Sequence, residues 1–354
     1  MPQNRPRVVI LAAPESSASV LYGLYDVLLS VGAMYPDMTT GQSGDSLLDV
    51  SIVAATGEPF RCFGNVLVEP GAAVGDVESP DVVVVCDMYT PIDIVPRGRW
   101  IVETAWLRRV HEQGALIASV CTGSVLLAEA GLLDGKTCAS HWAYRDLFKS
   151  AYPQVTLLPN AILDLQHELE GLITAGGVTA WQDLALHLIR RLAGPEHASQ
   201  TARVYLLAGH EDGQLPFAAP TQRVAIADAV IRESMAWITD NCTEPNPVSA
   251  MTERSGLTRR TFARRFIAAT GHRPIDHVQR LRIERARDLI EHGDTALDDV
   301  GYQVGYEDPA FFRRLFRRTT GLTPAAYRRK YAGVAGRPEA GGTVSAGPVV
   351  TSAR

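Results

Sequence analysis

The sequence has 354 residues, about twice the length of a typical domain, and 46% of them are apolar. This composition excludes a disordered or fibrous protein and predicts two globular domains with packed cores. No run approaches the roughly 18 consecutive apolar residues of a membrane-spanning helix, and the first residues lack the apolar core of a secretion signal. We therefore expect a cytoplasmic protein with no membrane partner.

The five cysteines are odd in number and show no metal-type spacing. This pattern indicates reduced thiols rather than a disulfide framework. We expect neither a metal nor another cofactor.

The net charge of −5 conceals two halves of opposite sign. Residues 1–215 contain 13 Lys or Arg and 24 Asp or Glu, a net −11, whereas residues 216–354 contain 21 and 15, a net +6. The stretch 254–330 alone has 17 basic and 9 acidic residues, a net +8. A basic half joined to an acidic half indicates a polyanionic partner for the first and a small ligand for the second. Arginines that lie on solvent-exposed helix faces and bind no partner would give the same count.

The first half alternates between short β-branched apolar runs, typical of buried parallel strands, and helical patterns. The expected strands lie at residues 7–13, 49–55, 81–86, 115–120 and 173–177. The expected helices lie at residues 20–34, 100–113, 124–132 and 180–192. This alternation predicts a doubly wound α/β domain with a flavodoxin-like sheet in residues 1–215.

Around residues 209–221 the sequence turns polar and contains several Gly and Pro, which marks a domain boundary. We expect an all-α domain in residues 216–331, because helical patterns fill it and no strand pattern does. The Gly-, Ala-, Pro- and Ser-rich residues 332–354 are expected to form a disordered tail.

The basic half contains an internal repeat with an offset of 50 residues. The recurring pairs are Phe262 and Phe312, Phe266 and Phe316, Thr270 and Thr320, Gly271 and Gly321, and Pro274 and Pro324. Each copy has a short helix, a turn at Gly256 or Gly305, and a second helix opened by the capping residue Thr258 or Asp308. The sequence therefore predicts two helix-turn-helix units.

The second helix of each unit presents arginines on its outer face. Phe262 and Phe266 share one face, so Arg260 and Arg264 project from the opposite one. Arginine suits this position because its planar fork pairs with O6 and N7 of guanine or with a phosphate. The predicted DNA-contacting residues are Arg259, Arg260, Thr261, Arg264, Arg313, Arg314 and Arg317. A helical bundle whose arginines contact only water is the alternative.

On these residues, the stretch from about Ile231 to Tyr331 resembles the DNA-binding domain of AraC-type transcription regulators. Its most specific parts are Leu297–Phe316 and Gly321–Arg328. The resemblance implies that the two units bind neighbouring major-groove segments of double-stranded promoter DNA. Gly301 stands where the family usually has Ala and should cost about 0.5–1 kcal/mol of local helix stability. Met251 and Thr252 likewise replace the usual Leu and Ala.

Cys121 stands where an apolar strand turns directly into a helix, between the small residues Ser119 and Gly123. This is the steric requirement of a nucleophile elbow. The helix N-terminus behind the sulfur predicts a lowered thiol pKa and an anion site. His141 is a candidate partner base. A small buried cysteine and a hydrogen-bonded core histidine are the plain alternative.

This half resembles the class I glutamine-amidotransferase-like superfamily, in its intracellular-protease and isonitrile-hydratase branch. The resemblance covers about Arg7 to Arg191 and rests on the Cys121 elbow and on four further stretches, Ala128–Gly135, Ser140–Trp142, Thr174–Gly177 and Asp183–Leu186. Protease-like members have histidine where this chain has Thr122. Hydratase-like members have aspartate on the first strand–helix connection, where this chain has Ser17, Ala18, Ser19 and Val20 with only Glu15 nearby.

An activated nucleophile needs a base held by a third group, and the sequence reveals none. The main hypothesis is therefore a transcription regulator that is not an enzyme, binds a small-molecule effector near Cys121 and forms a homodimer through residues 1–215. The predicted effector-binding residues are Glu15, Cys121, Thr122, Gly123, His141, Thr174 and Gly176.

Three alternatives stay open. The first is an active cysteine hydrolase or hydratase with a DNA-localising tail, the second a redox sensor that uses the Cys121 thiolate, and the third a monomer on an asymmetric site. Neither the effector, the operator nor the direction of regulation follows from the sequence.

Overall fold

The computed structural model describes residues 5–42, 44–92, 94–218 and 227–332. It divides into two compact units, unit 1 over residues 1–218 and unit 2 over residues 219–354. Except for residue 332, the predicted tail lies outside the described residues.

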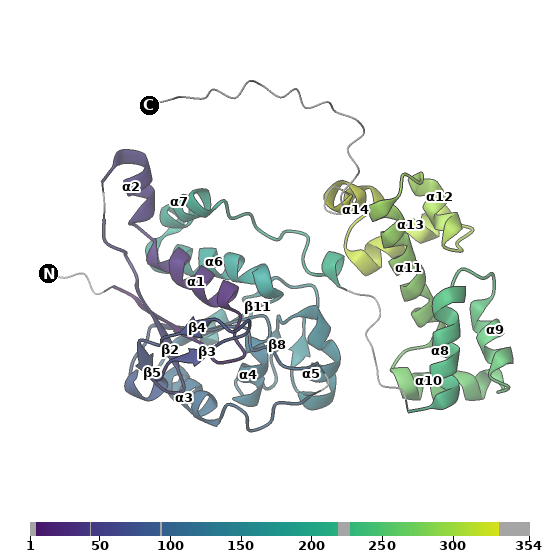
Figure 1. The fold of residues 1–354 in the computed structure, drawn as a ribbon, viewed down its shortest axis with the longest axis horizontal. Coiled ribbons are helices and arrows are strands. Elements are labelled where there is room, and N and C mark those ends of the chain that lie inside the picture. The colour runs from purple at the N-terminus through teal and green to yellow at the C-terminus, as the bar shows by residue number, and fades with distance from the viewer. Residues whose placement is uncertain (1–4, 43, 93, 219–226, 333–354) are drawn as a thin grey trace, which may run out of the picture. The chain divides into compact units, whose positions relative to one another are not determined.

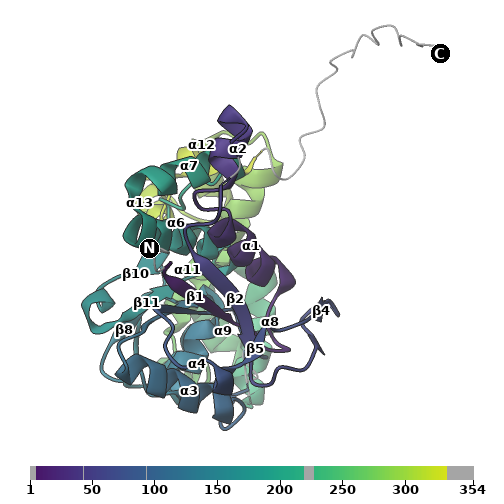
Figure 2. The same ribbon diagram turned by 90° about the vertical axis from the view of Figure 1, so that its left-hand side faces the viewer.

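Unit 1 is built on a seven-stranded sheet in the order β10-β11-β7-β6-β1-β2-β5. All neighbours pair in parallel except β10 and β11, which are antiparallel. The sheet strands are β1 (Arg7–Leu11), β2 (Asp49–Ala54), β5 (Ala72–Ala73), β6 (Val82–Val85), β7 (Leu116–Val120), β10 (Leu163–Asp164) and β11 (Leu172–Ala175). Figure 2 shows β1, β2 and β5 as neighbours. The expected parallel strands and α/β class are confirmed.

Four very short strands lie outside this sheet. They form an antiparallel hairpin and a parallel pair. Their bounds are β3 (Phe60–Arg61) and β4 (Leu67–Val68) in the hairpin, and β8 (Thr137–Cys138) and β9 (Thr156–Leu157) in the pair.

Helices cover both faces of the sheet, as a doubly wound fold requires (Figure 1). One face packs against α1 (Ala18–Leu29), α6 (Trp181–Ala193) and α7 (Pro195–Tyr205). The other face packs against α3 (Ile101–Glu112), α4 (Gly123–Glu129) and α5 (Arg145–Ala151). Successive residues of β1 alternate between the two cores, with Val8 and Ile10 in one and Val9 and Leu11 in the other.

The helix expected at residues 20–34 is shorter and interrupted. It ends at Leu29, and a separate helix, α2 (Met34–Thr40), follows a turn in which Gly32 has a φ of +80°. No single described helix is long and apolar enough to cross a membrane, and only the bent pair of α1 and α2 passes that test jointly. The inner side chains of α1 are buried in the core of unit 1.

Unit 2 is entirely helical in its described residues. Its helices are α8 (Ala229–Asn241), α9 (Pro247–Arg254), α10 (Arg259–Thr270), α11 (Pro274–His292), α12 (Leu297–Gln303), α13 (Pro309–Thr320) and α14 (Pro324–Tyr331). The predicted caps are confirmed, because Thr258 accepts a hydrogen bond from Thr261 N and Asp308 accepts one from Ala310 N. Gly256 and Gly305 have φ values of +66° and +88°, which explains glycine at both turns.

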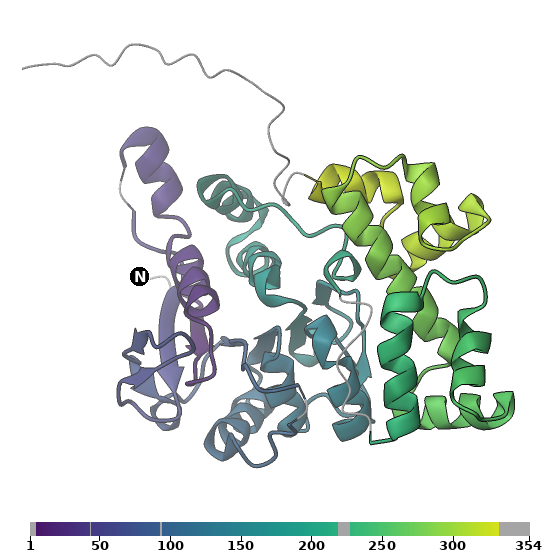
Figure 3. The same cartoon turned by 45° about the vertical axis from the view of Figure 1, so that its right-hand side comes forward.

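The two helix-turn-helix units have separate cores. The first is formed around Phe262 and Phe266, and the second around Phe312 and Phe316. The long helix α11 contributes to both and runs from one group of helices to the other (Figure 3). Gly301 is packed beneath Phe312, since a Cβ there would lie 3.1 Å from Phe312 Cδ1. The small residue therefore makes room for the ring.

A buried histidine makes unit 2 sensitive to acid. His277 packs against the Phe266 ring, with 5.8 Å between ring centroids, and burial lowers its pKa from 6.5 to about 4. The unfolded chain takes up this proton near pH 6.5, whereas the folded unit resists it until about pH 4. The free energy of unfolding should therefore fall by up to about 3 kcal/mol as the pH drops through this range. Urea titrations from pH 7 to 4 will measure the loss, and His277→Leu should remove that part of it. An identical pH dependence in the variant would contradict this origin.

Candidate functional site

The helices α10 and α13 present their arginines to solvent. Six of the seven predicted DNA-contacting residues are exposed and Thr261 is half-buried; the exposed ones are Arg259, Arg260, Arg264, Arg313, Arg314 and Arg317. The repeated phenylalanines are buried on the opposite side, at 1% exposure or less, namely Phe262, Phe266, Phe312 and Phe316. The arrangement leaves each row of guanidinium groups available to a phosphate or a base edge.

Two of the predicted contact residues also have structural partners. The Thr261 hydroxyl accepts a hydrogen bond from Thr258 Oγ1 at 3.0 Å, within the N-cap of α10. The Arg313 guanidinium pairs with Asp298 at 2.8 Å, and both side chains are more than half exposed. Such an exposed pair is weak, so Arg313 can exchange this carboxylate for a phosphate at low cost.

Cys121 occupies a strained turn between β7 and α4. Its φ is +54°, which is rare for a residue other than glycine. Gly123 permits the turn because a Cβ there would overlap the Cys86 carbonyl oxygen and lie 2.8 Å from that of Val85. The Thr122 hydroxyl accepts a hydrogen bond from Met88 N at 2.9 Å. The chain thus adopts the geometry of an elbow, and Thr122 fastens it to the loop after β6.

The expected lowering of the Cys121 pKa is wrong. The residue is 4% exposed, and burial together with the nearby charge of Asp87 raises its pKa to about 12. Loss of solvation therefore outweighs the helix N-terminus. The raised pKa disfavours the thiolate on which the redox-sensor alternative depends.

His141 has one ring nitrogen occupied as a hydrogen-bond acceptor. Burial lowers its pKa, and Nδ1 accepts a hydrogen bond from Ala143 N at 3.2 Å. The proton of the neutral ring therefore sits on Nε2, which makes that atom a donor. Among the described residues, no hydrogen bond joins His141 to Cys121.

A carboxylate that the sequence analysis did not identify lies beside the elbow. Asp87 follows β6, and Ser17 follows β1; Ser17 donates to it from N at 3.1 Å and from Oγ at 2.5 Å. Asp87 is 3% exposed, and burial raises its pKa against these hydrogen bonds. The strands β1 and β6 are neighbours between which the order of the sheet reverses, and in open α/β sheets ligands bind at that point.

Glu15 also follows β1, and one oxygen of its carboxylate is paired with an arginine. Its Oε1 accepts from Arg99 Nε at 2.5 Å, while its buried Oε2 has no hydrogen-bond partner among the described residues. We call Glu15, Ser17, Asp87, Cys121 and His141 the elbow site. Its members come from the carboxyl ends of successive parallel strands and from the loop after β8.

Thr174 and Gly176 have structural roles on β11 and just beyond it. The Thr174 hydroxyl accepts from Ala139 N at 2.8 Å. Gly176 leaves room for Gln214, because a Cβ there would overlap the Gln214 amide and lie 2.6 Å from the Ala161 carbonyl oxygen.

Gln214 is the second residue that the sequence analysis missed. It is 3% exposed, and its Nε2 donates to Ser140 O at 2.9 Å and to Ala161 O at 2.8 Å. Its Oε1 accepts from Trp142 N at 3.3 Å. The side chain thereby holds the loop that carries His141.

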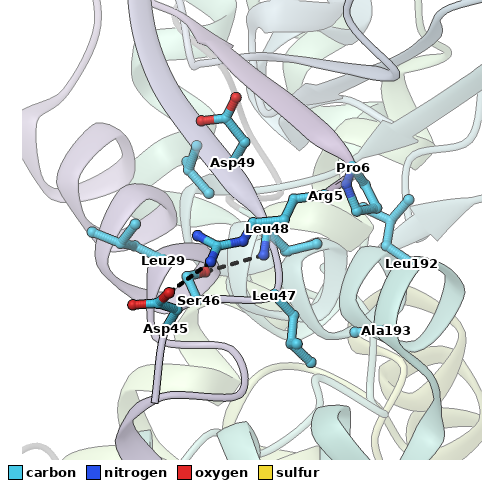
Figure 4. A pocket seen from close by; sticks show the side chains of 11 residues that line it. Arg5, Pro6, Leu29, Asp45, Ser46, Leu47, Leu48, Asp49, Leu192 and Ala193 are labelled. Atoms are coloured by element: carbon cyan, nitrogen blue, oxygen red, sulfur yellow. Dashed lines mark hydrogen bonds and ion pairs between the residues drawn. The ribbon is translucent and has the colours of Figure 1, made fainter. Parts of the chain in front are cut away.

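The structure also contains a large open cavity, of about 1240 Å³, far from the elbow site (Figure 4). It lies at the amino ends of β1 and β2, beside Leu29, Leu47 and Leu192, and an Arg5–Asp45 ion pair of 2.8 Å crosses it. Cys121 lies at the opposite, carboxyl edge of the sheet. Because ligands of parallel α/β sheets bind at carboxyl ends, the elbow site is the stronger candidate.

An α/β unit with a cysteine elbow and a basic unit with paired helix-turn-helix elements together define a DNA-binding transcription regulator of the AraC type. Residues 7–191 match the DJ-1/PfpI family, and residues 251–330 match a helix-turn-helix domain. The chain belongs to the DJ-1/PfpI family.

Two curated relatives align with this chain along most of their length. The chain is 27% identical to the HTH-type transcriptional regulator CdhR of Pseudomonas aeruginosa, over 86% of this chain and 88% of that protein. It is 26% identical to the HTH-type transcriptional regulator GlxA of Rhizobium meliloti, over 75% and 82%. It is similar to the crystal structure of an AraC family transcriptional regulator from Pseudomonas putida, at 19% identity over 56% and 99% with a TM-score of 0.45. Both resemblances predicted from the sequence are confirmed.

Replacing Arg260, Arg264 or Arg314 by Ala should weaken binding to the promoter duplex by about 1–3 kcal/mol and relax base preference at one position each. The reason is that a base edge, unlike a phosphate, differs between sequences. Fluorescence anisotropy on promoter and random duplexes will separate the two effects. Arg285→Ala, at an exposed position of α11, is the control. Equal losses on both duplexes for all three variants would show that these arginines do not read bases.

Proposed function

We propose that this regulator responds to a small molecule bound at the elbow site and forms a homodimer through unit 1. The observation that supports an effector site is the meeting of Ser17, Asp87 and Cys121 where the order of the sheet reverses. A buried carboxylate, the Ser17 hydroxyl, the Cys121 thiol and the His141 imidazole are groups that select a small polar ligand by hydrogen bonds.

Binding without turnover fits these groups better than catalysis does. Burial raises the pKa of the Cys121 thiol to about 12, and among the described residues no hydrogen bond joins it to His141 as a base. Asp87 is bound to Ser17 rather than to His141. The cysteine hydrolase or hydratase with a DNA-localising tail requires the opposite on the first two counts.

Cys121→Ser should leave promoter affinity within about twofold, because unit 2 supplies the DNA contacts, while changing the affinity for the effector. A thermal-shift screen of small metabolites identifies a ligand, and anisotropy measures promoter binding. We expect no turnover of amide, peptide or isonitrile probes by the wild-type protein. Cys138→Ser, which alters another buried thiol, is the matched control. Turnover that Cys121→Ser abolishes and Cys138→Ser preserves would favour the enzyme.

We propose that Gln214 transmits the response to the effector from the elbow site to the end of unit 1. Gln214→Ala removes its two hydrogen bonds to the His141 loop and a third to Ala161 O, so promoter affinity without effector should persist while the change caused by effector is lost. Coupling energies between sites are typically about 1–3 kcal/mol, which titration with and without effector resolves. Gln200→Ala, whose amide pairs with Glu196 on the surface of α7, is the control. An unchanged effector response in Gln214→Ala would exclude this route.

The dimer surface we propose is the exposed hairpin of β3 and β4. Phe63 is 54% and Leu67 48% exposed, and the Phe63 ring packs at 5.2 Å on Tyr89, which is 56% exposed. Exposed aromatic clusters of this kind favour protein contacts. Sedimentation equilibrium at tens of micromolar should give a dimer, Phe63→Glu a monomer, and Leu169→Glu, at a fully exposed position elsewhere on unit 1, a dimer. A wild-type monomer would support the asymmetric alternative.

A further inference from the structure

Arg282 joins the two helix-turn-helix units. It lies on α11 and is 8% exposed, although buried arginines are uncommon. Along α11, Val278 belongs to the first core, and Ile283, Ala286 and Ile290 belong to the second. Arg282 therefore stands where the helix passes from one unit to the other.

The guanidinium group binds a turn of each unit at once. In the first helix-turn-helix unit, Nε of Arg282 donates to Cys242 O at 2.6 Å and Nη2 donates to Glu244 O at 2.8 Å, both in the turn between α8 and α9. In the second helix-turn-helix unit, Nη1 donates to Gly305 O at 2.7 Å, in the turn between α12 and α13.

The neighbouring contacts leave little freedom at this junction. The Arg282 guanidinium carbon lies 5.1 Å from the centre of the Tyr306 ring, so the charged plane is also covered by an aromatic one. A Cβ on Gly305 would lie 2.7 Å from Thr243 O and 2.9 Å from Arg282 Cζ. The two turns are thus closely packed against each other and against this side chain.

We propose that Arg282 is a positioning residue that fixes the angle and spacing between α10 and α13, and thereby the separation of the two DNA segments that the chain accepts. Three charge-assisted hydrogen bonds from one planar group set direction as well as distance. An ammonium group cannot reproduce that fork, so Lys retains the charge without the orientation. The inference rests on DNA binding by both helix-turn-helix units. It adds a residue that sets the spacing of the operator without contacting DNA.

The test uses the full chain and a duplex that the wild-type protein selects from a random pool. Dissociation constants are measured on this duplex, on duplexes with one or two base pairs inserted between the two segments, and on duplexes with one segment randomised. Each inserted pair moves one segment by about 3.4 Å and rotates it by about 34°. The wild-type protein should therefore lose about tenfold or more in affinity per insertion.

In Arg282→Met and Arg282→Lys we expect the loss of affinity per inserted base pair to fall to about threefold or less. Affinity for duplexes with one segment randomised should stay within about twofold of wild type. Arg285→Lys and Arg285→Met, three residues further along α11 at an exposed position, should retain the wild-type profile. Thermal melting accompanies each measurement. Arg282→Lys is the milder change and keeps the test available should Arg282→Met fail to fold.

Three results would overturn the proposal. The first is a spacing profile in the Arg282 variants parallel to that of the wild type. The second is a uniform loss on all duplexes together with a lower melting temperature, which would make Arg282 a purely structural residue. The third is equal affinity of the wild-type protein for duplexes of all spacings, since the two helix-turn-helix units would then move independently.

Discussion

The close approach of α4 to the end of β6 is the contact on which the functional edge of unit 1 depends. Without a side chain at Gly123, the helix begins against the carbonyls of Val85 and Cys86. The same contact directs the loop after β6 across the edge, where Thr122 fixes Met88 and Ser17 fixes Asp87. The strain of Cys121 at φ +54° is the local cost of this packing.

An elbow is a matter of backbone geometry, and reactivity is a matter of solvation. In an enzyme the strained turn lifts the nucleophile towards its substrate, and a base must accept its proton. Here the same turn leaves Cys121 4% exposed, burial raises its pKa to about 12, and no hydrogen bond joins it to His141 among the described residues. The elbow geometry of the fold therefore does not by itself establish catalysis, which must be argued from the neighbouring side chains.

Local patterns in the sequence predicted the elements well, because the forces that form them act over a few residues. The apolar runs became β1, β2, β6, β7 and β11, and the repeated phenylalanines marked both cores of unit 2. The helices α2, α5 and α7 were not predicted. The site was predicted less completely, since its chemistry depends on contacts between distant residues.

Asp87 and Gln214 show two different limits of prediction. Asp87 directly follows a buried run, and the rule that carboxyl ends of parallel strands meet at one edge could have identified it. Gln214 offered no such signal, because it lies in a polar, Gly- and Pro-containing stretch that resembles a linker, and it bonds to Ser140, 74 positions away. The Cys121 pKa was predicted in the wrong direction because burial of the sulfur follows from the packing of the whole edge.

Side-chain hydrogen bonds hold the chain on both sides of residues 219–226. Before them, Gln214 is bonded to the loop of the elbow site. After them, Asp228 caps α8 and pairs with Arg265 of α10 through two hydrogen bonds of 2.8 Å. Each unit thus fixes its end of the connection to its own functional element. Buried hydrogen bonds such as those of Gln214 are worth about 0.5–1.5 kcal/mol each, so the three together reach the range of typical coupling between two sites. Under the proposal that an effector acts through Gln214, release of this side chain would free the end of unit 1 without rearranging the core of that unit.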